Sequence, residues 1–275
     1  APEAIRSGKY RFLRTAPLQF SPVNPRALYL ASNVLFRTTT GGDAWKIISP
    51  DLSRESPEVP ENIGIYRTPS LAKQARRGVI YALGLSPIDE EVIWAGTDDG
   101  LVHRSTDGGA HWTDVTPTPV TAWSKVSGID AGHLDRKTAY LAVNRIRLDD
   151  MRPHIYRTHD NGMTWQEIVR GLPANGPVNV VREDPVQPGL LFAGTERAVY
   201  VSFDDGDRWL PLRRNMPATS IRDLVIHQSD VVVGTHGRSF WILDNMSELR
   251  QLCAGMVKAP PYLFKPDDAV RIRWN

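Results

Sequence analysis

The sequence of 275 residues has a single cysteine, Cys253, and so forms neither an internal disulfide nor a cysteine-based metal cluster. Its 33 basic and 31 acidic residues nearly cancel, which argues against a nucleic-acid-binding surface. No apolar run approaches the roughly 18 residues of a membrane-spanning helix. Residues 1–12 also lack the apolar core of a signal peptide. We therefore expect an ordinary globular chain with no membrane span and no nucleic-acid partner.

Sustained helical periodicity is missing too, as are the motifs of common cofactor sites. The sequence contains no P-loop, dinucleotide fingerprint or nucleophile elbow, and its histidines show no zinc-ligand spacing. The stretches GTDDG and DNG lack the spacing of a calcium loop. We predict neither a metal nor a cofactor. What the chain does have is 21 glycines, 21 prolines and eight tryptophans, a composition that favours short strands joined by turns.

One turn pattern, Ser/Thr-x-Asp-x-Gly-x-x-Trp, recurs along the chain. It reads STDGGAHW, THDNGMTW and SFDDGDRW, and a degenerate copy, TTTGGDAW, has Thr40 in place of the aspartate. Short apolar stretches precede each copy, and a further short strand follows each tryptophan. The unit is a four-stranded antiparallel meander, and its repetition predicts an all-β fold, a β-propeller of about five blades. We expect blades at 14–48, 79–115, 123–168, 177–212 and 220–244, with a closing tail at 245–275, in one domain or propeller fragment over 1–275.

The residues of the repeated turn have an architectural explanation. The aspartate and hydroxyl groups can hold the N–H groups of the turn, and glycine supplies the positive φ. The tryptophan is expected to fold back over its own hairpin and cap it. We therefore assign structural roles to Ser105, Asp107, Gly109, Trp112, Thr158, Asp160, Gly162, Trp165, Ser202, Asp204, Gly206 and Trp209.

These turns resemble the Asp-box, or BNR, repeats of sialidases, of two-propeller xyloglucan hydrolases and of sortilin-type Vps10 receptors. Together with GTHGRSFWILDN and YLFKPDDAVRIRWN, they make the sequence similar to large bacterial exported proteins with sortilin-like propellers, which are often labelled glycosyl hydrolases. The resemblance implies a propeller in an exported protein. Because the box is architectural in all these families, it leaves the activity open.

Propeller geometry places the ligand face. With strands A to D in each blade, the A–B and C–D turns share one face, and the B–C loops and D–A connections share the other. The repeated turns are C–D turns, and the long insertions Pro50 to Gly78 and Asn144 to Pro153 fall on the second face. Because functional loops gather on one rim of a rigid scaffold, we expect the ligand there. The ligand-face candidates are Asn33, Asn144, Arg145, Arg197, His236 and Arg238.

Two functions remain open at this rim. Asp98 or Asp99, facing Asp130 or Glu196 across a cleft, would suit glycoside hydrolysis. Arg145, Arg197 and Arg238 could grip a carboxylate as in a sialidase, or pair with acidic neighbours. Nothing marks a Tyr–Glu nucleophile pair, so we favour a non-catalytic module that binds a protein, peptide or glycan. The alternative is an Asp-box glycoside hydrolase, sialidase-like or xyloglucanase-like, acting on a polysaccharide or glycan.

Five units make either a small ring or part of a larger one. Closing a ring removes free strand edges, and both GKYRFLRTAP and PYLFKPDDAVRIR could supply edge strands. We favour part of a larger propeller, completed by further blades or by a partner chain. The alternative is a self-contained five-bladed ring.

Overall fold

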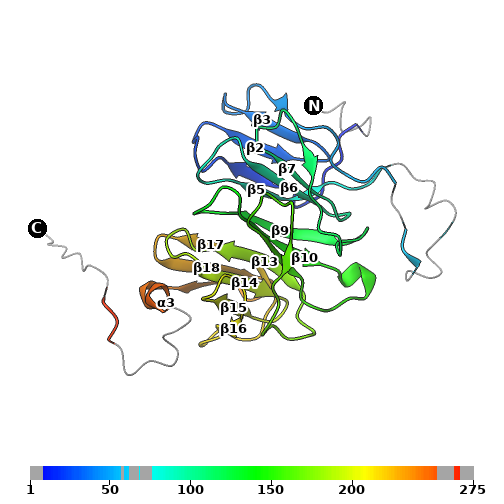
Figure 1. The fold of residues 1–275 in the computed structure, drawn as a ribbon. Coiled ribbons are helices and arrows are strands. Elements are labelled where there is room, and N and C mark those ends of the chain that lie inside the picture. The colour runs from blue at the N-terminus through cyan, green and yellow to red at the C-terminus, as the bar shows by residue number, and fades with distance from the viewer. Residues whose placement is uncertain (1–8, 57–58, 62–67, 69–75, 253–262, 267–275) are drawn as a thin grey trace, which may run out of the picture.

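The computed structural model describes residues 9–56, 59–61, 68, 76–252 and 263–266. These residues form five antiparallel sheets, which follow one another as blades in chain order (Figure 1). Blade 1 contains β1 (Leu18–Phe20), β2 (Leu28–Ala31), β3 (Leu35–Thr38) and β4 (Lys46–Ile47). Blade 2 contains β5 (Ile80–Leu85), β6 (Ile93–Thr97), β7 (Val102–Ser105) and β8 (Thr113–Asp114).

Blades 3 and 4 have the same four-stranded order. Blade 3 contains β9 (Lys125–Ala131), β10 (Ala139–Asn144), β11 (Ile155–Thr158) and β12 (Gln166–Glu167). Blade 4 contains β13 (Val178–Glu183), β14 (Leu191–Thr195), β15 (Val199–Ser202) and β16 (Leu210–Pro211). Blade 5 contains β17 (Ile221–His227), β18 (Asp230–Thr235) and β19 (Phe240–Leu243). Helical structure in the described residues includes η2 (Ile146–Leu148) and α3 (Ser247–Gln251). The predicted all-β propeller is confirmed.

Packing between blades explains the apolar strands. The second strands of blades 2, 3 and 4 are buried along their whole length, because both faces of these sheets are covered. In β2, by contrast, only alternate residues are buried. Four hydrophobic clusters lie between consecutive blades, centred on Tyr29 and Ile93, Trp94 and Leu141, Tyr140 and Trp209, and Phe192 and Leu224.

The four copies of the repeated turn, named here the Asp-Gly-Trp turns, share one hydrogen-bond pattern. In the third copy along the chain, which ends at Trp165, Gly162 N–H donates to Thr158 Oγ1 at 2.9 Å, and Thr164 N–H donates to Asp160 Oδ1 at 2.9 Å. Hydrogen bonds from the Thr164 side chain and backbone hold the pKa of Asp160 at about 2. The degenerate copy uses the Thr40 hydroxyl in the same way, accepting Ala44 N–H at 3.0 Å. A carboxylate so engaged fits a structural role.

The tryptophans of these turns join blades, which adds to the expectation that each caps its own hairpin: Trp112 Nε1 also donates to the Gly109 carbonyl of its own turn at 3.2 Å. Trp112 Nε1 donates to the Ile48 carbonyl of blade 1 at 2.8 Å. Trp165 and Trp209 repeat the bond across the next two interfaces, to Val115 O at 2.7 Å and to Ile168 O at 2.8 Å. The indole needs both apolar cover and a hydrogen-bond acceptor, and the preceding blade offers both.

Glycine in the turn is required by the same contact. Gly206 has φ +88°, and a Cβ there would lie 2.3 Å from Ile168 Cδ1 of blade 3. At Gly162, with φ +81°, a Cβ would lie 2.9 Å from Val115 Cβ of blade 2. The turn therefore presses its backbone directly against the preceding blade.

Blade 5 departs from the pattern, because three of its strands are found in the described residues where four were expected. Leu243 occupies the position that Ser105 has in blade 2, since Val231 pairs with Leu243 as Ile93 pairs with Ser105. The hydroxyl that holds the turn is therefore missing, and the chain continues into α3. Arg250 of α3 binds the fully buried Asp184 of blade 4, with Nε to Oδ2 at 2.7 Å.

Candidate functional site

Backbone hydrogen bonds place the loops on the two predicted faces. The B–C loops contact the D–A connections through Asp98 N–H to Val79 O at 3.0 Å and Glu196 N–H to Pro177 O at 3.0 Å. On the other face, the C–D turn of blade 3 contacts its own A–B turn through Asn161 N–H to Lys137 O at 2.9 Å. The B–C loops and D–A connections together form a rim, named here the B–C rim, and it is the candidate site.

A chain of polar side chains crosses the B–C rim from blade 3 to blade 5. Asn144 Nδ2 donates to Asn179 Oδ1 at 3.1 Å, and Asn179 Nδ2 donates to Glu196 Oε1 at 2.9 Å. Arg222 then donates to the same Glu196 oxygen at 3.2 Å. Both asparagines are buried, so their amides are positioned by the scaffold. Asn144 is thus a buried residue that stabilises the rim through its hydrogen bond to Asn179.

Glu196 is a carboxylate already committed to this network. Burial raises its pKa, but hydrogen bonds such as that from Asn179, and the positive charges of Arg222 and Lys125, outweigh burial and leave the pKa below its ordinary value. Lys125 Nζ lies 4.7 Å from the ring centroid of Tyr81. An ionised, hydrogen-bonded Glu196 is poorly suited to act as a general acid.

Asp98 and Arg145 are each engaged in an ion pair at the B–C rim. Asp98 Oδ1 accepts Val79 N–H at 3.0 Å, and its Oδ2 lies 3.2 Å from Arg147. Arg145 pairs with Asp150 at 3.5 Å, both from the inserted B–C loop of blade 3. The expected pairing with acidic neighbours is therefore found for Arg145, whereas Arg197 and Arg238 pair with no acidic side chain among the described residues.

Asp99 is covered by the D–A insertion. Its Oδ2 accepts the Arg54 N–H at 2.9 Å, its Oδ1 accepts the Thr97 hydroxyl at 2.5 Å, and burial raises its pKa. A Cβ on Gly78 would lie 1.9 Å from Asp99 Oδ2. Backbone therefore closes over this carboxylate and leaves little room for a substrate.

Asp130 lies on the opposite face, so the expected pairing of Asp98 or Asp99 with Asp130 is wrong. It is near the end of β9 where Ala131 pairs with Ala139, whereas Lys125 at the start of β9 pairs with Asn144. Its Oδ2 accepts the backbone N–H of Glu183 at 2.7 Å and joins blades 3 and 4. Five residue steps of extended strand, at about 3.3 Å each, separate it from Lys125 at the rim.

Asn33 is held at the rim of blade 1 by two residues that the sequence did not single out. Its Oδ1 accepts Arg11 N–H at 2.9 Å, and its Nδ2 donates to Asp51 Oδ2 at 2.9 Å. Arg11 also pairs with Asp51 at 2.8 Å. Burial raises the pKa of Asp51, but hydrogen bonds from Ser53, Arg11 and Asn33 outweigh it and lower the pKa. Asn33 is buried and so supports the loop.

Three basic side chains remain exposed on adjoining loops of blades 4 and 5: Arg197, His236 and Arg238. Thr219 joins these loops, with its N–H donating to Arg197 O at 3.2 Å and its hydroxyl to His236 O at 3.4 Å. Within the described residues, no hydrogen bond or ion pair engages the three side chains. They are the part of the candidate site that is available to a ligand.

Comparison with known proteins adds fold-level relationships. No protein-family model matches the chain. An oligoxyloglucan-reducing end-specific xyloglucanase of Emericella nidulans is 26% identical over 104 residues, which cover 38% of this chain and 13% of that protein. The GH74 xyloglucanase of Xanthomonas campestris superposes with a TM-score of 0.60 at 18% identity, over 84% of this chain and 36% of the enzyme. The chain shares the propeller fold of the GH74 xyloglucanases.

A third propeller, YCF48 bound to D1 peptide, superposes with a TM-score of 0.52 at 17% identity, over 85% of this chain and 67% of YCF48. By comparison, the chain spans about a third of the length of the Xanthomonas campestris GH74 enzyme and about an eighth of the length of the Emericella nidulans xyloglucanase. At these identities, the structural likeness concerns the fold alone.

The rim residues missed by sequence share one position in the propeller. Lys125, Asn179 and Arg222 lie at the start of an inner A strand, or within two residues of it, where the strand leaves the D–A connection. The A strands begin on the same face as the B–C loops, where the ligand was expected. No group of three or more His, Cys, Asp or Glu suited to a metal occurs in the described residues. No helix among these residues has the length and apolarity to span a bilayer.

Proposed function

We propose that the chain is a non-catalytic binding propeller whose B–C rim recognises an acidic peptide segment of a protein. The observation that supports this most strongly is the state of the rim carboxylates. Asp98, Asp99 and Glu196 each accept hydrogen bonds from the scaffold itself. Glycoside hydrolysis needs two carboxyl groups that flank a substrate bond about 5–10 Å apart. Carboxylates already bound to the protein's own donors are poor candidates for that work.

The chemistry of the ligand follows from the exposed basic groups. Arg197 and Arg238 present guanidinium groups that have no partner among the described residues, and a guanidinium can bind a carboxylate through two parallel hydrogen bonds. His236 adds a third donor on the adjoining loop. The resemblance to Asp-box and sortilin-like propellers, and the D1 peptide held by YCF48, are consistent with peptide binding by this fold.

Fluorescence anisotropy with labelled hexaglutamate, and with hexaglutamine as the neutral probe, tests the proposal. The wild type should bind hexaglutamate more tightly, and the double variant Arg197→Ala/Arg238→Ala should weaken that binding roughly three- to tenfold, as expected for two exposed charge contacts. Arg208→Ala is the matched control, because Arg208 is exposed on the Asp-Gly-Trp face. Equal affinity of the double variant and the wild type would contradict the proposal.

A glycoside hydrolase is the second candidate, favoured by the 26% identity over 104 residues to a xyloglucanase. It is tested by the release of reducing ends from xyloglucan, with Asp98→Ala, Asp99→Ala and Glu196→Ala as variants. Turnover by the wild type that is abolished in one of these variants would replace the binding function with catalysis. We expect no turnover.

A further inference from the structure

The inner A strands of blades 2 to 5 share a β-bulge beside the B–C rim. In β5, the two neighbours of Tyr81 pair with successive residues of β6, so Tyr81 is an extra residue in the ladder. The same irregularity occurs at Ser127 of β9, Asn179 of β13 and Arg222 of β17. Bulges re-aim side chains and are over-represented beside functional sites. The four bulge residues thus occupy equivalent positions, on the face where the ligand is expected.

The two middle bulge residues connect neighbouring blades. Ser127 Oγ donates to the Val178 carbonyl of β13 at 3.2 Å, and Asn179 Nδ2 donates to the Ile221 carbonyl of β17 at 3.0 Å. Val178 and Ile221 have the same position, one residue before the bulge of their own strand. In blades 3 and 4, the bulge residue therefore holds the A strand of the next blade in place.

The two outer bulge residues, Tyr81 and Arg222, lack this bond in the described part of the chain. The Tyr81 ring instead supports Lys125, whose Nζ lies 4.7 Å from the ring centroid. That ammonium makes neither a hydrogen bond nor an ion pair with any described residue. Arg222 uses Nη1 to bind Glu196 Oε1 at 3.2 Å, and its side chain is 47% exposed. Lys125 and Arg222 thus both have N–H groups to offer a ligand.

The connection that leads into Lys125 is strained. Trp123, two residues earlier, has φ +67°, a left-handed conformation that is rare for so bulky a side chain. Lys125 itself begins β9 and pairs with Asn144, so the sheet fixes its backbone. Strained residues persist where the surrounding structure holds them, and they cluster at ligand-binding sites. The strain beside Lys125 is a second indication of a site at this place.

A short series of neighbours links Lys125 to Arg222. Asn144, the partner of Lys125 in the sheet, donates to Asn179. Asn179 and Arg222 then donate to the same oxygen of Glu196. Burial raises the pKa of Glu196, whereas hydrogen bonds and the positive charges of Arg222 and Lys125 lower it, so both cations lie near this carboxylate. Two cations around one carboxylate leave one positive charge in excess.

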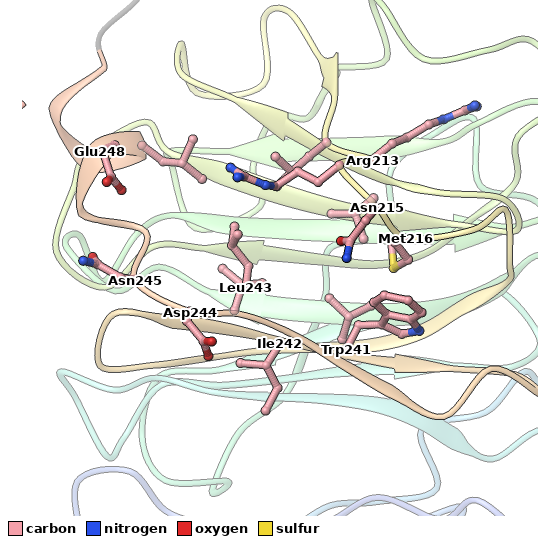
Figure 2. A pocket seen from close by; sticks show the side chains of 15 residues that line it. Arg213, Asn215, Met216, Trp241, Ile242, Leu243, Asp244, Asn245 and Glu248 are labelled. Carbon is pink, nitrogen blue, oxygen red and sulfur yellow. The ribbon is translucent and has the colours of Figure 1, made fainter.

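A cavity of about 520 Å³ between blades 4 and 5 is a competing place for an acidic ligand, because Arg213 and Arg214 line it. Asp244 and Glu248 line the same cavity as Arg213 (Figure 2). Among the lining residues, two carboxylates therefore balance two guanidinium groups. The balance of charge favours the place between Lys125 and Arg222 over this cavity.

We propose that Lys125 and Arg222 form a subsite, named here the inner mouth, that binds one carboxylate of the acidic peptide. This inference rests on the proposed function and adds a contact on the inner A strands to those on the exposed loops. The ammonium of Lys125 and the spare N–H groups of Arg222 donate to the carboxylate. Tyr81 is a positioning residue, because its ring holds the ammonium in place. Glu196 holds Arg222 and leaves one positive charge for the ligand.

Fluorescence anisotropy with labelled hexaglutamate, acetylated and amidated at its ends, tests the inner mouth. Lys125→Met removes the charge but keeps an unbranched stem, and it should weaken binding by about tenfold or more, because a hydrogen bond between charged groups is lost. Lys137→Met is the matched control, since Lys137 is exposed on the Asp-Gly-Trp face. It should bind as the wild type does.

Variants of Tyr81 test its positioning role. Tyr81→Phe keeps the ring and should leave binding unchanged, whereas Tyr81→Leu should weaken it roughly two- to fivefold, as expected for a lost cation–π contact. In the Lys125→Met background, Tyr81→Leu should cause no further loss, because it acts through Lys125. An equal loss in both backgrounds would overturn the positioning role.

A second probe, hexaglutamine with a free C-terminal carboxylate, identifies the source of the bound group. If Lys125→Met weakens the capped hexaglutamate, a side-chain carboxylate occupies the inner mouth. If it weakens only the second probe, the chain terminus does. If it weakens neither, while Arg197→Ala/Arg238→Ala weakens hexaglutamate binding, the inner mouth is overturned and the proposed function stands. Weakening by Arg213→Met in place of Lys125→Met would assign the peptide to the cavity and also overturn the inner mouth.

Discussion

At the scale of single residues, the tryptophans of the repeated turns connect neighbouring blades, a role that their sequence context does not indicate. Each of three indoles hydrogen-bonds the carbonyl of a residue that follows the fourth strand of the preceding blade. Trp165 also makes an edge-on contact with Trp94 of blade 2, with ring centroids 5.9 Å apart. The first copy, Trp45, has no preceding blade in the described residues and is partly exposed.

This difference between Trp165 and Trp45 can be tested by making the same substitution at both positions. Trp165→Phe should destabilise the protein by about 1–3 kcal/mol, because it leaves the Val115 carbonyl without its donor in a largely buried place. Trp45→Phe should cost well below about 1 kcal/mol, as expected for an exposed substitution. Chemical denaturation of both variants measures the two values. Equal losses would show that the interblade hydrogen bond contributes nothing to stability.

At the scale of elements, the C–D turn is a contact between blades as well as a hairpin end. A Cβ on Gly206 or Gly162 would lie within 3 Å of a side-chain atom of the preceding blade, so that side chain would have to move. Gly108 also has positive φ, +68°, but nothing lies within 4 Å of its Cβ position. The effect of backbone strain on stability can therefore be measured separately from the effect of steric contact, by comparing two glycines of the same type of turn.

Gly206→Ala should destabilise the protein more than Gly108→Ala does. Both substitutions strain a left-handed backbone, at about 1–2 kcal/mol. Only Gly206→Ala also pushes a methyl group into Ile168, for a further cost of about 1–3 kcal/mol. Thermal unfolding of the two variants, followed by circular dichroism, gives the comparison. A smaller loss of stability for Gly206→Ala than for Gly108→Ala would mean that the preceding blade accommodates the added methyl group at little cost.

At the scale of the whole molecule, stability should vary along the row of blades. Blades 2, 3 and 4 each contribute to two interblade clusters, whereas blades 1 and 5 each contribute to one. Apolar side chains are accordingly exposed on the end blades, including Leu18 and Phe20 on β1 and Phe240 and Ile242 on β19. In a repeat protein, stability is the sum of unit and interface contributions.

Hydrogen exchange across the chain should follow this order. Amides of β10 and β14 should exchange slowest, and those of β2 and β18 should exchange faster by roughly tenfold or more, because the end blades lose one interface each. Mass spectrometry of peptic fragments gives the rates blade by blade. Uniform protection across all five blades would mean that the outer faces of blades 1 and 5 are covered in solution.

Much of this fold could be predicted from the sequence, because its determinants are local. The Ser/Thr, Asp and Gly of each turn bond within eight residues, and the spacing of those turns defines the meander. The division of loops between two faces follows from strand alternation alone. The predicted position of Asp130 was wrong because Asp130 lies near the end of β9 and not in a loop of the B–C rim. β9 runs from one face of the propeller to the other.

The sequence by itself determined the repeated hairpin, the antiparallel blade and the face on which the inserted loops lie, since these depend on contacts between near neighbours in the chain. Only the tertiary structure decided which blade each indole joins, which carboxylates are already bound and where a strand edge stays free. Those features depend on contacts between residues 17 to 64 positions apart, and such contacts leave no fixed spacing in the sequence.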